Sequence, residues 1–251
     1  MNGYYLKEHE WQYIFDYLSK IPRIHIKNTE KLQRFVEAIY YVLRSGVQWR
    51  LLPKTFGHWR SIHNRFLRWR DKSIWHNLFA ISSNDNNLQQ VMIDATVVRS
   101  HACASGYEKG GNQKQALGRS KGGFTTKIHA LVDALGNPVK IVLTEGNRHD
   151  INKAEELVEG ITNAIFIADK AYDSDKFRTL LNGNKCITVI PPKKNRKIQY
   201  EYDKHIYKER HLVECFFSKL KQYRRVFSRF DKMKSTFQCF IDIDSTLICI
   251  H

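Results

Sequence analysis

The segment Tyr207–Lys221 sets a carboxylate, Glu214, among basic and apolar residues. A helix of 3.6 residues per turn brings four of its polar side chains onto one arc, beside an apolar face: Tyr207, Arg210, Glu214 and Lys221. A carboxylate at the edge of a core, flanked by cations, suits a metal ligand next to phosphate groups. For this segment alone, the simpler interpretation is an amphipathic helix with an ordinary Arg210–Glu214 pair four residues apart.

Two upstream aspartates favour the metal-ligand interpretation, because one lies within an apolar run and the other directly follows one. Asp94 interrupts the strand-like run Val91–Val98, and Asp169 directly follows a short apolar stretch. A buried, unpaired carboxylate costs several kcal/mol, so such a residue needs a strong partner. The end of a strand is also where α/β sheets place their ligands. A purely structural role remains open for each: Asp94 could pair with Arg99 or Lys170, and Asp169 could cap the next turn.

Taken together, the three carboxylates predict a catalytic metal centre. Asp94, Asp169 and Glu214 come from three separate elements, and such a set can hold two divalent ions about 3.5–4 Å apart. One ion activates an attacking water or 3′-hydroxyl, and the other stabilises the leaving oxygen of an in-line phosphoryl transfer. Mg²⁺ is the expected ion, because it prefers oxygen ligands and keeps waters beside one or two carboxylates.

The charge of the 251-residue chain predicts a polyanionic partner, with nucleic acid before a membrane. The formal net charge is +16, with 41 Lys and Arg against 25 Asp and Glu. Residues 1–85 hold 14 basic and 7 acidic residues, and residues 193–234 hold 14 and 5. Two separate basic regions indicate two places of contact. A merely basic soluble protein is the alternative.

The five cysteines show neither a CxxC pair nor zinc-type spacing, which indicates free thiols in a reducing compartment. No signal peptide is apparent, and no uncharged run approaches membrane-spanning length. We therefore expect a cytoplasmic protein.

Residues 1–85 predict a small all-α domain. Helices are expected at 8–18, 30–45, 59–69 and 72–80, with a cap at Asn28 or Thr29 and a core built from four tryptophans: Trp49, Trp59, Trp69 and Trp75. The third helix carries four arginines, which is compatible with helix-turn-helix DNA binding: Arg60, Arg65, Arg68 and Arg70. A solvated basic face on a helical bundle is an equal alternative.

Residues 86–251 predict an α/β catalytic domain. Strands are expected at 91–99, 124–133, 139–145, 165–168 and 187–190, with helices at 151–159, 174–181 and over the Glu214 segment. Antiparallel strands followed by alternating helices and strands match a ribonuclease H-like mixed sheet with flanking helices. Between the first two strands, residues 104–123 contain six glycines and should form a mobile basic loop, which either closes over nucleic acid or is simply solvated.

With these residues in view, the sequence resembles the DDE transposases of bacterial insertion sequences. The group's signature is Tyr, two residues, Arg, three residues, Glu, six residues, Lys, and Tyr207, Arg210, Glu214 and Lys221 match it. Other segments also look like this group: Val47–Trp69, Ile93–His101, Gly118–Val139, Gly146–Asp150 and Ala168–Asp175. The last 15 residues resemble the group's end less well, and we give them no role.

The resemblance implies the site and its partners. It assigns Asp94, Asp169 and Glu214 as the catalytic and metal-binding triad, using Mg²⁺, for which Mn²⁺ can substitute. It implies a homodimer, associated with the bacterial nucleoid, that binds the terminal inverted repeats of its element, cuts there and joins the 3′-hydroxyl ends to target DNA. Arg210 and Lys221 would contact phosphate, and Tyr207 a base or sugar.

Other basic residues are candidates for contacts with the DNA backbone. They are Lys121, Lys127, Arg224, Arg225, Arg229 and the run Lys193–Lys197. His149 and Asp150 lie in a loop near the expected site, where helix capping is the favoured role of Asp150. Two other functions stay open: a nuclease without strand transfer, and a catalytically silent repressor that binds the element's ends.

Overall fold

The computed structural model describes residues 5–22, 24, 28–84, 86–105 and 115–251. Its N-terminal part contains the four expected helices: α1 (Glu8–Ser19), α2 (Thr29–Ser45), α3 (Trp59–Asp71) and α4 (Ile74–Ser82). Asn28 caps α2, because its side chain accepts a hydrogen bond from the Lys31 amide at 2.8 Å. Gly46 ends the same helix in the left-handed conformation (φ 67°), which favours glycine.

The tryptophans do not all build the core of this helical unit. Trp69 and Trp75 are buried and pack on Phe35 and Phe66, with ring centroids 4.9–6.5 Å apart. Trp49 is half-buried and packs on Phe66 and also on Phe240 in the C-terminal helix α10 (Lys234–Cys249). Trp59 is half-buried as well. The N-terminal unit therefore shares its core with the end of the chain.

The C-terminal part is a seven-stranded mixed sheet with flanking helices, as expected for the ribonuclease H-like fold. β1 (Gln90–Ser100) pairs antiparallel with β3 (Gly123–Asp133), and β3 pairs antiparallel with β4 (Pro138–Glu145). On its other side β1 pairs in parallel with β5 (Ile165–Ile167), which pairs in parallel with β6 (Ile187–Val189). β2 (Gly118–Ser120) and β7 (Ser228–Arg229) are short additions, on β3 and β1 respectively.

Two interpretations of the chain between these elements need correction. The glycine-rich stretch is not wholly irregular, because Gly118–Ser120 forms β2, while residues 106–114 lie outside the described residues. The helix expected at 151–159 is shorter and partly 3₁₀, consisting of η4 (Asp150–Lys153) and α6 (Ala154–Leu157). Other short 3₁₀ turns are η1 (Trp49–Leu51), η2 (Lys54–Phe56), η3 (Ala102–Ala104) and η5 (Lys170–Tyr172).

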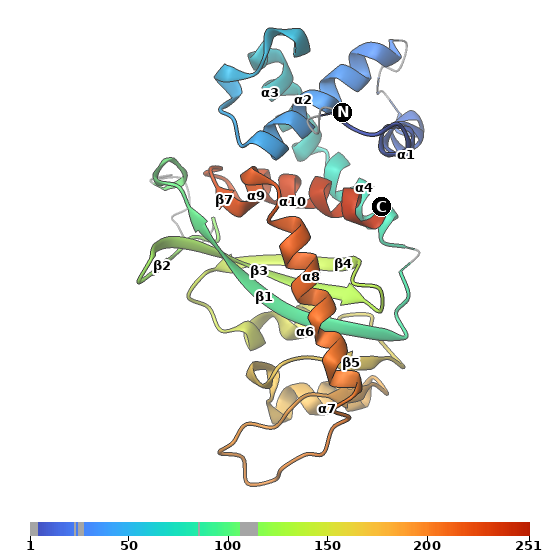
Figure 1. Cartoon of the computed structure of the whole chain (residues 1–251), viewed down its shortest axis with the longest axis vertical. Helices are drawn as coiled ribbons and strands as arrows, with labels where there is room; N and C mark the ends of the chain where they lie inside the picture. The colour runs from blue at the N-terminus through green and yellow to red at the C-terminus, as the bar shows by residue number, and fades with distance from the viewer. Residues whose placement is uncertain (1–4, 23, 25–27, 85, 106–114) are drawn as a thin grey trace.

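The sheet is covered on both faces, and alternate residues of β1 show which helix covers which face (Figure 1). Met92 and Val98 belong to the same apolar cluster as residues of α8 (His211–Leu220) and α10. Val91 and Ile93 belong to a second cluster, with residues of α6 and α7 (Asp175–Gly183). In Figure 1, α8 crosses β1 on one side of the sheet, so the segment bearing Glu214 lies over the strand bearing Asp94.

The C-terminal helix joins the two halves. α10 packs against α4, α3, α8 and β4, and Figure 1 shows it with α9 (Arg224–Phe227) between the sheet and helices α1–α3. Its surroundings explain why it is buried along most of its length.

Candidate active site

Strand register places Asp94 and Asp169 side by side. Met92 in β1 is the parallel partner of Ile167 in β5, and each aspartate follows two residues later. Residues two apart in a strand share a face, and neighbouring strands lie about 4.8 Å apart. Asp94, inside β1, and Asp169, two residues beyond the end of β5, therefore both lie on the α8 face of the sheet. Asp169 also caps η5, accepting a hydrogen bond from the Ala171 amide at 2.7 Å, so the capping alternative is realised too.

The pKa of Asp94 reflects both its burial and the carboxylates that lie near it. Burial raises the pKa of Asp94 to about 6, and the nearby Asp169 and Asp150 carboxylates act in the same direction. The Ala95 amide, 2.7 Å from Asp94 Oδ1, and the Arg210 guanidinium oppose the rise. Asp94 is therefore mostly ionised at pH 7, and a bound divalent cation would favour its charged form further.

Arg210 connects Asp94 to Glu214. The expected single helix begins as a 3₁₀ turn, η6 (Ile206–Arg210), and continues as α8. Arg210 Nη1 lies 2.8 Å from Asp94 Oδ2, while Arg210 Nη2 pairs with Glu214 Oε1. The simple i,i+4 pair is thus present, but the same guanidinium also bridges to β1. Glu214 keeps a side chain that is 54% exposed, so it remains accessible to a ligand.

A hydrogen bond from Lys221 links the C-terminal end of α8 to β1. Its Nζ donates to Thr96 Oγ1 at 2.5 Å, and burial lowers the pKa of Lys221. Thr96 lies two residues beyond Asp94 and so shares its face of β1. Sequence reasoning missed Thr96, although alternation along the strand was a signal that could have found it. Tyr207 lies near Arg210 and packs edge-on against Tyr202, with ring centroids 5.5 Å apart.

The donor set fits a hard divalent cation, because all three candidate ligands are carboxylates. In the described part of the chain, their oxygens do not all approach within 4.8 Å of one another. The guanidinium of Arg210 binds one oxygen each of Asp94 and Glu214, whereas Asp169 accepts from the Ala171 amide. Two of the three residues that would hold the metal are therefore paired with an internal cation.

The structure separates the remaining DNA-contact candidates into exposed and buried groups. Lys121 and Arg224 are exposed. Lys127 points to the opposite face of the sheet from Asp94, where its Nζ binds Arg148 O at 2.6 Å and Asp150 Oδ1 at 2.7 Å. Asp150 is thus the partner of Lys127, and the expectation that it caps a helix is replaced by this ion pair.

Arg225 and Arg229 lie in the interior, contrary to their assignment as backbone contacts. Arg225 forms a two-pronged pair with Asp231, at 2.7 and 3.0 Å, and donates to Val47 O at 3.2 Å. Arg229 is fully buried and donates to backbone carbonyls and to Thr126 Oγ1 at 2.7 Å. Arg225 therefore links the C-terminal part to the helical unit through Val47, whereas Arg229 links segments within the C-terminal part. In the run Lys193–Lys197 the lysines are exposed, while Arg196 pairs with acidic residues of its own neighbourhood.

Comparison with known proteins places this geometry in a family. Residues 6–79 match the model described as a putative transposase of the IS4/5 family, and residues 86–238 match the transposase DDE domain. The chain belongs to the DDE transposase family. The two matched segments correspond to the helical unit and to the part of the chain that contains Asp94, Asp169 and Glu214.

Two curated relatives of this transposase chain are putative transposases of insertion sequence elements. It is 40% identical over 130 residues to a putative transposase for insertion sequence element IS6501 from Brucella ovis, covering 51% of this chain and 100% of the relative. It is 26% identical over 136 residues to a putative transposase for element IS402 from Burkholderia cepacia, covering 49% of this chain and 62% of the relative.

Two solved transposase structures are also similar to the chain. A piggyBac transposase synaptic complex with hairpin DNA gives a TM-score of 0.37 at 12% identity, covering 76% of this chain and 43% of that one. A pre-cleavage Mos1 transpososome gives a TM-score of 0.29 at 11% identity, covering 86% of this chain and 77% of that one.

A search of the described helices for membrane spans found none with the length and hydropathy that crossing a bilayer requires.

Proposed function

We propose that the chain is an active transposase that binds the terminal inverted repeats of an insertion sequence, cleaves DNA there and transfers the freed strands to target DNA. The observation that carries this proposal is the registration of Asp94 and Asp169 on one face of adjacent parallel strands, with Glu214 tied to Asp94 through Arg210. A cluster of carboxylates from three elements, with Arg210 and Lys221 beside it, suits phosphoryl transfer.

Asp94, Asp169 and Glu214 would hold two Mg²⁺ ions, with Mn²⁺ as a substitute. When bound, such ions activate the attacking oxygen and stabilise the leaving oxygen. Arg210 neutralises two of these carboxylates in the free protein, and a DNA phosphate offers its guanidinium an alternative partner of equal charge. Lys221, held by Thr96 along β1, supplies a second cation on the same side. Tyr207 lies in η6, before α8, and its ring can pack on a sugar or base.

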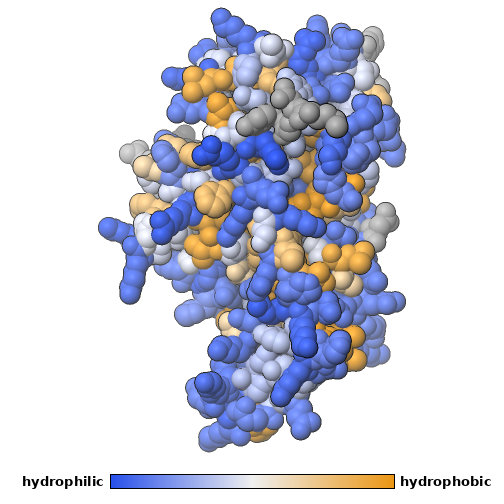
Figure 2. Space-filling model, viewed as in Figure 1, coloured by the Kyte–Doolittle hydropathy of each residue, from blue (hydrophilic) through white to orange (hydrophobic). Residues whose placement is uncertain are grey.

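Residues 1–85 would form a DNA-binding domain. The DNA-binding surface would extend from the carboxylate site to this helical unit. Arg60 and Arg68 on α3 are exposed, whereas Arg65 stacks on Phe35, 4.2 Å from the ring centroid, and is half-buried. The two exposed arginines are therefore the members of this helix available for DNA. Figure 2 shows hydrophilic side chains over much of the face that includes α8. We infer a cytoplasmic homodimer acting on nucleoid DNA, because two element ends must be brought together.

A plasmid-cleavage assay tests the proposal. Supercoiled plasmid carrying the element's ends is incubated with wild type and with Asp94→Asn, Asp169→Asn and Glu214→Gln, in Mg²⁺ and in EDTA. We expect cleavage at the ends by wild type in Mg²⁺ alone, at least 100-fold slower cleavage by each variant, and unchanged DNA affinity. Near-normal cleavage by any variant would remove that residue from the metal site.

A second assay separates strand transfer from simple hydrolysis. Pre-cut, labelled element ends are mixed with an unlabelled target duplex, and covalent joining is measured on a denaturing gel. Joined product establishes a transposase. Cleavage without joining identifies a nuclease, and specific binding without cleavage identifies a repressor.

A further inference from the structure

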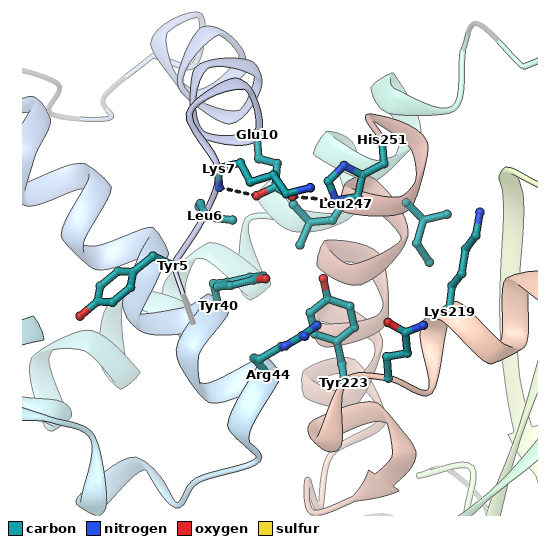
Figure 3. Close-up of a pocket in the computed structure, with 12 residues that line it drawn as sticks. Tyr5, Leu6, Lys7, Glu10, Tyr40, Arg44, Lys219, Tyr223, Leu247 and His251 are labelled. Carbon is teal, nitrogen blue, oxygen red and sulfur yellow. Dashed lines mark hydrogen bonds and ion pairs between the residues drawn. The ribbon is translucent and has the colours of Figure 1, made fainter. Parts of the chain in front are cut away.

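A second group of potential metal ligands lies far from the carboxylate cluster, where the first and last helices meet. His9 and Glu10 belong to α1, and His251 follows the end of α10. Each offers one ligand atom, and these three atoms lie within 4.8 Å of one another, a closeness that no other group of His, Cys, Asp or Glu reaches among the described residues. Figure 3 shows Glu10 and His251 facing each other across the junction of α1 and α10.

Glu10 is fixed in place before any ligand arrives. It is a charged residue that is 2% exposed. Its Oε2 accepts a hydrogen bond from the Lys7 backbone amide at 2.6 Å, so this oxygen and the side-chain orientation are held by α1 itself. Its Oε1 faces His251 Nε2 at 2.9 Å. A carboxylate with one oxygen held by a backbone donor and the other directed at an imidazole resembles the supported ligands of protein metal sites.

We propose that His9, Glu10 and His251 bind a divalent transition-metal ion of the zinc type. Two imidazole nitrogens and one carboxylate oxygen form a donor set that proteins use for Zn²⁺, with a fourth position left for water. Bond lengths of about 2.0–2.1 Å in a tetrahedral site place ligand atoms roughly 3.3 Å apart. The Glu10–His251 pair is already near that spacing. The His9 and His251 rings lie with centroids 5.6 Å apart, and His9 is exposed and free to turn.

The surroundings select the class of ion. The site borders a cavity of about 740 Å³ that is also lined by three cations: Lys7, Arg44 and Lys219. These cations oppose a hard ion that depends on charged oxygen ligands, so Mg²⁺ is disfavoured. An ion that bonds strongly to neutral imidazole nitrogen is less affected. The proposed site is thereby chemically distinct from the all-carboxylate set on the sheet.

Occupancy would join distant parts of the chain. α1 belongs to the helical unit, and α10 packs on the sheet side of the molecule as well as on α4. A metal held by both helices stabilises the folded state by mass action, since the three ligands are far apart in the unfolded chain.

Equilibrium dialysis of the full chain against micromolar Zn²⁺, in excess Mg²⁺, tests the site. Cys103 and Cys215 are exposed and could bind zinc themselves, so the assay uses a Cys103→Ser, Cys215→Ser background. We expect one Zn²⁺ per chain, a rise in Tm on Zn²⁺ addition, and at least tenfold weaker binding in His9→Ala and in Glu10→Gln. His58→Ala, an exposed histidine elsewhere in the helical unit, serves as the matched control and should bind like the background.

His9→Ala is the decisive variant, because His9 is exposed and its loss leaves the core intact. Co²⁺ substitution adds a spectroscopic readout: a d–d spectrum of tetrahedral nitrogen and oxygen ligation, without thiolate charge-transfer bands, supports the site. Zn²⁺ affinity that is unchanged in His9→Ala and Glu10→Gln would overturn the proposal and leave Glu10–His251 as a simple ion pair. So would the absence of stoichiometric binding in the background protein.

Discussion

Asp244 should make the stability of this protein fall as pH rises. The residue lies in α10, is fully buried, and neither carboxyl oxygen has a hydrogen-bond partner among the described residues. Burial raises the pKa of Asp244 well above its ordinary value, and the distant attraction of Arg44 only partly opposes the rise. The folded protein therefore keeps this proton to a higher pH than the unfolded chain does.

The magnitude follows from proton linkage. Above pH 3.8, the ordinary pKa, the unfolded chain releases the proton while the folded chain keeps it, so folding takes up one proton. The free energy of unfolding then decreases by about 1.4 kcal/mol per pH unit until the folded-state pKa is reached. Each pH unit in that range therefore removes a sizeable part of the roughly 5–15 kcal/mol typical of a folded protein.

Urea unfolding of wild type and Asp244→Asn at pH 5, 6 and 7 measures the effect. The asparagine has the same size and the same unmet hydrogen bonds, so subtracting the two curves isolates the proton. We expect the stability advantage of the variant to grow by about 1.4 kcal/mol per unit. Asp16→Asn, at an exposed position of α1, should show a flat difference. A flat difference for Asp244→Asn as well would refute the reasoning and mean that Asp244 is ionised and paired in the folded state.

Three further changes test other parts of the structure. Arg225→Ala should destabilise the protein by about 3–5 kcal/mol in urea unfolding, because it leaves Asp231 buried without its partner; a loss below 1 kcal/mol would show that water reaches Asp231. Arg224→Ala should change the free energy of unfolding by no more than about 0.5 kcal/mol. It should weaken DNA binding, and the slope of log affinity against log salt concentration should fall by about one unit. An unchanged slope would place Arg224 in solvent in the complex. Burial lowers the pKa of His129 from 6.5 to about 4, so the free energy of unfolding should fall by about 1.4 kcal/mol per pH unit as pH drops from 6.5 toward 4. His129→Gln should abolish that part of the acid sensitivity. Unchanged acid-unfolding curves would contradict the lowered pKa of His129.

Local pattern was enough to nominate the candidate carboxylates, whose role as metal ligands stays a prediction. An aspartate inside an apolar strand and another directly after one are visible in the sequence, and parallel pairing of β1 with β5 then brings Asp94 and Asp169 together. What the pattern could not give was the crossing of α8 over β1. That crossing makes Arg210 a bridge between Asp94 and Glu214 rather than a partner of Glu214 alone. It depends on tertiary packing, which no single segment encodes.

The same limit explains the errors. Arg225 and Arg229 look like surface charge in a basic stretch, because charge type reveals nothing about burial, and Asp231 nearby was a weak signal of an internal pair. The division into residues 1–85 and 86–251 stays a prediction, since α10 contributes to the packing of both parts. The buried acids of α10 were likewise invisible as such, because a helix with interspersed aspartates reads as amphipathic.

The position of α10 has a consequence for how the protein is made. Of the described helices it is the last to be synthesised, yet Phe240 packs on Trp49 and Phe66 in the helical unit, and other residues of α10 pack on α8 and β4. A ribosome-bound chain that stops before residue 234 therefore lacks one wall of both cores. Each half must wait, with apolar surface uncovered, until translation passes α10. Nascent chains of this transposase should depend on holding chaperones until that point and then fold as one cooperative unit.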